Sequence, residues 1–172
     1  LGEAAAAVFV SNKNQTESIQ ILGDANINDA NHISGPSRTG EGLVLSIEKA
    51  LNEAQITSNQ IDYISAHGTA TLFNDEMEAI AFNRMQLQNV PVNSLKGYFG
   101  HTLGASGLLE SIITVESLKN NTIITSFGYE NQGTTQSLNI IKAKQEKPLK
   151  TALKTASGFG GSNSAMVFIK NY

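Results

Sequence analysis

Short apolar runs alternate along this chain with longer segments whose apolar residues recur at helical spacing. Runs typical of strands lie at residues 4–10, 18–26, 61–66, 90–95, 149–157 and 165–169. Spacings of three and four residues predict helices at 43–54, from 74 or 75 to about 87, and at 104–119. Shorter extended pieces are expected at 122–125 and 137–141, with polar loops at 28–42 and 126–136. We expect Thr39 to cap the first helix and Asn74 or Asp75 to cap the second.

From residue 18 onward, strands and helices alternate and the chain closes with two adjacent strands. This order predicts an α/β fold with a mainly parallel sheet, helices over it and right-handed crossovers. The last two strands are joined so closely that they should form an antiparallel pair. Residues 4–10 are left over, as if they closed a preceding unit of the same kind. Because the first residue is Leu1 and not Met, we expect a piece of a longer polypeptide.

Composition excludes several classes of protein. The chain has 172 residues, 40% apolar and 6% aromatic, which suits one ordinary α/β domain. A net charge of −3 without a basic cluster argues against nucleic-acid binding. No apolar run reaches the roughly 18 residues of a membrane span. The chain has no cysteine, so it has no disulfide, thiolate metal site or cysteine nucleophile of its own.

Two histidines are the candidates for chemistry. His67 and His101 each follow a predicted strand, and Gly68 and Gly100 lie beside them. Ligands of open α/β sheets sit at the carboxyl edge of the strands, so a site built from two imidazoles is indicated. The alternatives are two structural, hydrogen-bonded histidines or a zinc site. No H-E-x-x-H motif and no third ligand at suitable spacing support zinc.

A lysine precedes the second histidine by five residues. Lys96 is either a solvated residue at a strand end or a buried cation near the imidazoles. A buried lysine needs a carboxylate partner, and Glu110 is the candidate. Its positive charge would favour the neutral form of a neighbouring imidazole, which still donates one N–H.

A glycine-rich turn near the end of the chain places one aromatic ring among three glycines, Gly158-Phe159-Gly160-Gly161. It is either a hairpin with a core-facing Phe159 or a movable aromatic gate over an apolar channel. It is not a phosphate loop, because no Lys-Ser/Thr and no helix follow. His32 lies in a polar loop and is expected at the surface.

Taken in register, four segments resemble the carboxy-terminal half of β-ketoacyl-(acyl-carrier-protein) synthases of the elongating type. They are Ala66-His67-Gly68-Thr69 with Asn74, Asp75 and Glu78; Lys96; Gly100-His101 with Gly104, Ala105, Gly107 and Glu110; and Gly158-Phe159-Gly160-Gly161 with Asn163. The resemblance runs along nearly the whole chain. It departs at Ile123-Ile124-Thr125, where the family usually has Pro-Pro-Thr, and at Thr155-Ala156-Ser157, where it usually has Asn-Ser-Phe.

The resemblance implies a thiolase-like fold, in which two βαβαβαββ halves pack into a five-layer body. This chain would supply one half, residues 18–172, as a mixed five-stranded sheet flanked by helices. Residues 1–17 would be the last strand of the other half and its connection. The nucleophilic cysteine would lie in that other half, so we expect this chain alone to be inactive.

The activity implied is an acyltransferase reaction, a decarboxylative Claisen condensation in fatty-acid or polyketide elongation. His67 and His101 would hold the thioester oxygen of the malonyl group, and Lys96, paired with Glu110, would orient the pocket. Phe159 would be the acyl gate. A non-catalytic partner resembling a chain-length factor is the alternative, and a thiolase fits less well because it pairs histidine with cysteine.

Further implications concern supports and partners. Asp75 and Glu78 would be structural supports of the site. The substrates would ride on the phosphopantetheine of acyl carrier protein, with no other cofactor and no metal. The partners would be that carrier protein and the chain's own amino-terminal half, in a cytoplasmic homodimer or heterodimer, with no nucleic acid and no membrane.

Overall fold

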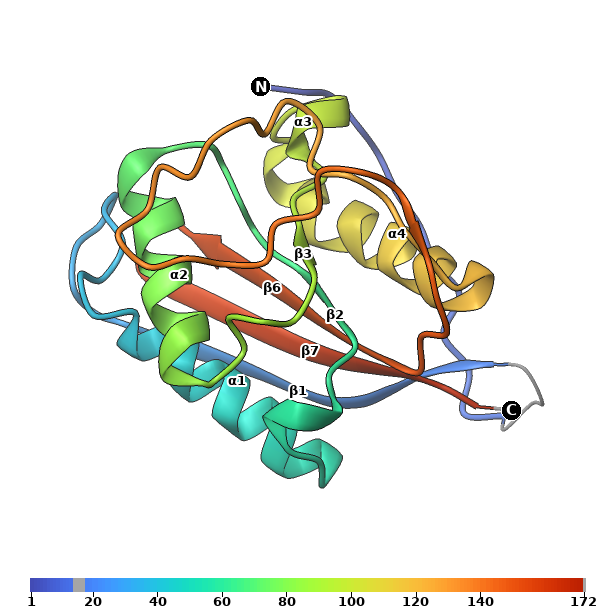
Figure 1. Cartoon of the computed structure of the whole chain (residues 1–172). Helices are drawn as coiled ribbons and strands as arrows, with labels where there is room; N and C mark the ends of the chain where they lie inside the picture. The colour runs from blue at the N-terminus through green and yellow to red at the C-terminus, as the bar shows by residue number, and fades with distance from the viewer. Residues whose placement is uncertain (14–17, 172) are drawn as a thin grey trace.

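The computed structural model describes residues 1–13 and 18–171. A five-stranded sheet in the order β1-β7-β6-β2-β3 has α1 and α2 on one face and α4 on the other (Figure 1). The strands are β1 Ile19–Asn28, β2 Tyr63–Ser65, β3 Val92–Asn93, β6 Thr151–Gly158 and β7 Ser162–Lys170. The helices are α1 Glu41–Ala54, α2 Leu72–Arg84, α3 Lys96–Phe99 and α4 Ser106–Asn120, with 3-10 turns η1 Ser58–Gln60 and η2 Leu103–Ala105. The helix-covered mixed sheet that the sequence predicts is therefore confirmed.

Strand direction decides where the loops emerge. β2 has two parallel neighbours, β3 and β6, while β6 and β7 form the predicted antiparallel pair and β1 pairs antiparallel with β7. Because β2 and β3 are parallel neighbours, their carboxyl ends open at the same edge of the sheet. The turns that follow Ser65 and Asn93 are therefore brought together.

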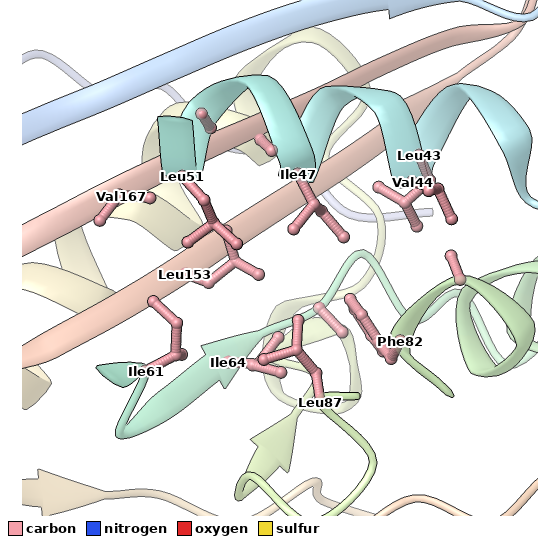
Figure 2. Packing of buried hydrophobic residues seen from close by; sticks show 14 of the residues in the cluster. Leu43, Val44, Ile47, Leu51, Ile61, Ile64, Phe82, Leu87, Leu153 and Val167 are labelled. Atoms are coloured by element: carbon pink, nitrogen blue, oxygen red, sulfur yellow. The ribbon is translucent and has the colours of Figure 1, made fainter. Parts of the chain in front are cut away.

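Apolar side chains fill both faces of the sheet, because successive residues of a strand point to opposite sides. The cluster beneath α1 and α2 includes Ile47, Ile64, Phe82, Leu153 and Val167 (Figure 2). The cluster on the α4 face includes Tyr63, Leu118, Ala152 and Phe168. Burial of one large apolar side chain contributes about 1.5–3 kcal/mol, so the two clusters fix α2 and α4 against the strands that precede them.

The start of α1 differs from the prediction. Thr39 does not cap the helix; its hydroxyl lies 3.1 Å from that of Ser37. The N-cap is Gly40, with a left-handed φ of 66°. A distant carboxylate takes over the capping role, since Asp29 Oδ1 accepts a hydrogen bond from Gly42 N at 2.6 Å. Contacts from elsewhere in the chain have replaced the local cap.

The cap predicted for α2 is also wrong. The helix begins at Leu72 after Thr71, so Asn74 and Asp75 lie within its first turn. Asn74 instead donates from Nδ2 to Glu78 Oε2 at 2.9 Å. Its side chain is engaged one turn further on and is not at the helix end.

Residues 4–10 do not form the buried strand that the apolar run predicts. They have no strand structure and are mostly exposed, with Phe9 at 91%. A strand requires a neighbouring strand for its backbone hydrogen bonds, and the described residues offer none at this position. Their assignment to another half, and the domain boundary after residue 17, stay predictions.

Two small pieces complete the fold. β4 Thr122–Ile123 pairs antiparallel with β5 Gln145–Glu146, a strand that the sequence pattern did not predict. Residues 137–141 do not form the expected strand but a single bridge between Val92 and Ile140. None of the helices in the described ranges is long and apolar enough to cross a membrane.

Candidate active site

The two histidine rings meet at the edge where β2 and β3 end. The ring centroids of His67 and His101 are 5.1 Å apart, and the ring planes are inclined by 81°. His67 is buried, at 5% exposure, whereas His101 is half-buried. The fold therefore joins two turns that are more than thirty residues apart in sequence.

Lys96 determines which nitrogen of His67 carries the proton. Its ammonium lies 3.2 Å from His67 Nδ1 and also donates to the His67 carbonyl at 2.5 Å. An ammonium only donates, so Nδ1 accepts, and the neutral ring carries its proton on Nε2. Burial, with the charges of Lys96 and Lys154 adding to it, lowers the pKa of His67 to about 2. The ring is neutral at physiological pH and presents one N–H.

His101 reaches the same tautomer by a different route. The backbone N–H of Leu103 donates to His101 Nδ1 at 3.0 Å, and Ser106 Oγ lies 3.1 Å from the same atom. Nδ1 is thus an acceptor, and the proton of the neutral ring is on Nε2. Burial and the charge of Lys96 lower the pKa of His101. Both histidines are neutral Nε2–H donors.

The turn that carries His101 is longer than predicted. α3 and η2 lie between the strand predicted at 90–95 and the body of the helix predicted at 104–119, and α4 begins at Ser106, two residues later than predicted. Leu103 adopts a left-handed φ of 53°, which costs a non-glycine residue about 1–2 kcal/mol. That conformation accompanies the placement of the Leu103 N–H on the ring of His101.

Lys96 and Glu110 form a buried ion pair. Lys96 Nζ lies 2.6 Å from Glu110 Oε1, and their side chains are 7% and 0% exposed. Lys96 opens α3 and Glu110 lies on α4. The solvated alternative for Lys96 is wrong, because the side chain lies between a carboxylate and an imidazole.

Sequence reasoning missed a second buried lysine. Lys154, on β6, is 4% exposed, and its Nζ lies 2.7 Å from Glu110 Oε2. It also donates to the carbonyl of Ser65 at 3.3 Å and to that of Thr155. Burial lowers the pKa of Lys154, and the charge of Glu110 opposes that shift. The available signal was a lysine that alternates with Ala152 and Ala156 along one face of the predicted strand at 149–157.

Glu78 holds the backbone of the first histidine turn. Its carboxylate, 2% exposed, accepts from His67 N at 2.8 Å and from Gly68 N at 2.7 Å. Burial raises the pKa of Glu78, and these two backbone donors oppose the shift. Asp75 is partly buried one turn earlier, and burial raises its pKa too. The contacts of Glu78 fix the backbone at His67 and Gly68, while the supporting role that the resemblance implies for Glu78 and Asp75 stays a prediction.

Phe159 lies apart from the ion pairs. It is at the tip of the hairpin between β6 and β7 and is 85% exposed, so it does not face the core. Gly158 ends β6, and Gly160 and Gly161 have left-handed φ of 82° and 81°. His32, in the loop before α1, is exposed as expected.

Within residues 1–13 and 18–171, no group of three or more His, Cys, Asp or Glu side chains could hold a metal ion. The site offers two neutral N–H donors beside a buried cation. Such donors suit an oxygen that acquires negative charge.

Comparison with known proteins points in the same direction. Residues 19–130 match the family model described as "Beta-ketoacyl synthase, C-terminal domain". The chain is 37% identical over 153 residues to the chloroplastic 3-oxoacyl-(acyl-carrier-protein) synthase II of Arabidopsis thaliana, over 87% of this chain.

Two solved structures share the fold. A ketosynthase in complex with its chain length factor, from Xenorhabdus doucetiae, superimposes with a TM-score of 0.86 and 29% identity over 93% of this chain. A type II polyketide ketosynthase, solved with its acyl-carrier protein, gives 0.81 and 31% over 88%. The chain spans only 28% of the plant protein and 40% and 38% of the two ketosynthases. It belongs to the β-ketoacyl synthase family and matches that family's C-terminal domain.

Proposed function

We propose that this chain is the carboxy-terminal part of a 3-oxoacyl-(acyl-carrier-protein) synthase, an acyltransferase of fatty-acid or polyketide elongation. The observation that carries the proposal is the pair of neutral Nε2–H imidazoles, with ring centroids 5.1 Å apart, beside the buried Lys96. Two such donors can hold one oxygen while it gains charge. The reaction that uses them is a decarboxylative Claisen condensation.

In this reaction a malonyl thioester loses CO2, and the electron pair of the broken C–C bond forms an enolate. The thioester oxygen becomes negative, and the N–H groups of His67 and His101 donate to it. The enolate carbon then attacks an acyl thioester on a cysteine, and the cysteine thiolate leaves. This chain has no cysteine, so the nucleophile must come from the amino-terminal half that the family resemblance implies.

The neutrality of His67 suits this role. A neutral imidazole donates a hydrogen bond without readily giving up its proton, so it stabilises the enolate and leaves the carbon free to attack. With its pKa lowered to about 2, His67 keeps this form across the physiological range. Lys96, paired with Glu110, contacts Nδ1 of the His67 ring and so orients it, while Asp75 and Glu78 support the turn that carries His67.

The remaining assignments concern the substrate and its carrier. We propose that acyl carrier protein delivers the malonyl group, since a ketosynthase that superimposes on this chain was solved with its acyl-carrier protein. We assign the acyl-gate role to Phe159, which lies on a turn with left-handed glycines and is 85% exposed, so core packing does not hold its ring. We further propose a homodimer or heterodimer in the cytoplasm as the working form.

The non-catalytic reading receives less support. A partner resembling a chain-length factor does not need two histidines in the donor tautomer or a lysine on one ring. All of these are retained here. The residue at the nucleophile position of the amino-terminal half would decide between the two readings.

The proposal is tested by supplying the amino-terminal half and measuring condensation of acyl and malonyl carrier-protein thioesters. His101→Ala should lower kcat by about 10²–10³-fold, as loss of one oxyanion donor does. His32→Ala is the matched control, because this exposed histidine lies outside the site. Equal turnover in the two variants would refute the role of His101. The 172-residue chain alone should show no turnover.

A further inference from the structure

Lys154 is a buried cation for which the proposed condensation has no role. It lies on the sheet face covered by α4, next along that face to Ala152, which packs in the apolar cluster there. A lysine in such a position is stable only with compensating partners. Its ammonium has three: Glu110 Oε2 at 2.7 Å, the Ser65 carbonyl at 3.3 Å and the Thr155 carbonyl.

Glu110 is consequently a bridge between two cations. Its oxygens lie 2.6 Å from Lys96 Nζ and 2.7 Å from Lys154 Nζ, and the side chain is 0% exposed. A carboxylate with one cationic partner can rotate about its last bond and present either oxygen. Two partners on opposite oxygens remove that freedom. Lys154 thereby restricts where Lys96 can place its ammonium.

The charges of the cluster also balance only when Lys154 is counted. In their ordinary ionised forms Lys96 and Lys154 carry two positive charges, and Glu110 and Glu78 carry two negative ones. Burial lowers the pKa of Lys154 and raises that of Glu78, and the opposite charges within the cluster oppose both shifts. Glu78 lies across the sheet on α2, and Thr155 Oγ1, next to Lys154, is 3.4 Å from its Oε1. Neighbouring residues of β6 thus reach both carboxylates, and in these ionised forms the four side chains have no net charge.

We propose that Lys154 is a positioning residue of the site: by holding one oxygen of Glu110 it fixes the other oxygen, and with it Lys96, against Nδ1 of His67. Its meaning for catalysis rests on the proposed function. The contact chain from Lys154 through Glu110 and Lys96 to His67 is a property of this chain itself. This contact chain can be tested without an assay of enzyme activity.

The test reads the histidine nitrogens directly, by long-range ¹H–¹⁵N correlation spectra of the ¹⁵N-labelled chain at neutral pH. In Lys154→Met, Glu110 is free to rotate, so the Nδ1 resonance of His67 should move downfield, toward that of a nitrogen without a hydrogen bond. Nδ1 of His101 should stay, because Leu103 N holds it. Lys154→Arg, which keeps a cation, should restore the His67 resonance. Lys150→Met, at an exposed lysine beside the same strand, is the control.

An unchanged His67 resonance in a folded Lys154→Met chain would overturn the proposal. If that variant does not fold, the wild-type chain decides: lysine ammonium spectra should show Lys154 in slow exchange with solvent, and a rapidly exchanging Lys154 contradicts the bridge. Failure of the proposed function is distinguishable, because a restored enzyme could lack condensation while His67 responds as described.

Discussion

The two histidine turns look alike in sequence and differ in how they are held. His67 is buried, its backbone is bound by the carboxylate of Glu78, and its ring is touched by the ammonium of Lys96. His101 is half-buried, and its ring is set by the N–H of Leu103 and the hydroxyl of Ser106. One turn depends on buried charge, and the other on neutral hydrogen bonds and an irregular backbone.

The difference shows that two different sets of contacts can hold an imidazole in the same tautomer. The ionic turn requires a charge cluster that spans α2, β6, α3 and α4. The neutral turn requires only its own loop and the first residue of α4. We therefore expect mutations of distant residues to affect His67 strongly and His101 weakly.

The largest effect should come from removing the shared carboxylate. Glu110→Ala leaves Lys96 and Lys154 buried without their common partner, and breaking buried pairs in this way costs about 3–5 kcal/mol. Urea unfolding followed by circular dichroism measures the loss. Glu116→Ala removes half of an exposed pair with Lys119 and should cost no more than about 0.5 kcal/mol. Similar costs for the two variants would contradict the comparison.

The next largest difference between the two histidine turns should come from steric crowding at their glycines. Gly68 has φ of 43°, and a Cβ there would lie 2.5 Å from Ser94 Cβ. Gly68→Ala combines about 1–2 kcal/mol of backbone strain with overpacking, so we expect a loss of about 2–3 kcal/mol. Gly104→Ala, in the second turn, meets no atom within 4 Å and should change stability by less than about 0.5 kcal/mol. Equal losses in the same unfolding assay would show that the second turn is as tightly packed as the first.

Much of the site was predictable because its elements are local. His67 and His101 each follow a strand, and Lys96 and Glu110 flank the second turn in sequence. Lys154 could not be connected with them by spacing. Its contact to Glu110 depends on β6 pairing beside β2, which is set by the whole sheet. The prediction for residues 4–10 fails for the opposite reason. Their local pattern predicts a strand, but the described residues offer no neighbouring strand with which it could pair.

Acid should destabilise the folded chain through His67, whose turn depends on buried charge. Its pKa is about 2 in the folded chain against an ordinary 6.5, so between these values the unfolded chain holds a proton that the folded chain lacks. The contribution of His67 to stability therefore falls as pH drops below 6.5, by up to about 1.4 kcal/mol per pH unit. His67→Gln removes this contribution, so its stability relative to wild type should rise on going from pH 6.5 to 5.

The same series on His101→Gln serves as the control for that titration. Burial also lowers the pKa of His101, so the sign is the same. The ring is half-buried and its Nδ1 partners are neutral, so we expect a shallower slope. Taking differences from wild type removes the opposite contributions of Asp75 and Glu78, whose pKa values are raised by burial. A slope for His101→Gln as steep as that for His67→Gln would mean that the two rings are not held differently.

A smaller effect, with the opposite sign, should appear at the second turn. Gly107 lies in the first turn of α4, and a Cβ there would meet no atom within 4 Å. Alanine restricts the unfolded chain and suits a helix better than glycine, so Gly107→Ala should stabilise the chain by about 0.4–1 kcal/mol. The midpoint of urea unfolding should rise while the His101 ring resonances stay in place. Destabilisation instead would mean that the loop around His101 is packed as closely as the turn at Gly68, and the contrast between the two turns would then be confined to their charges.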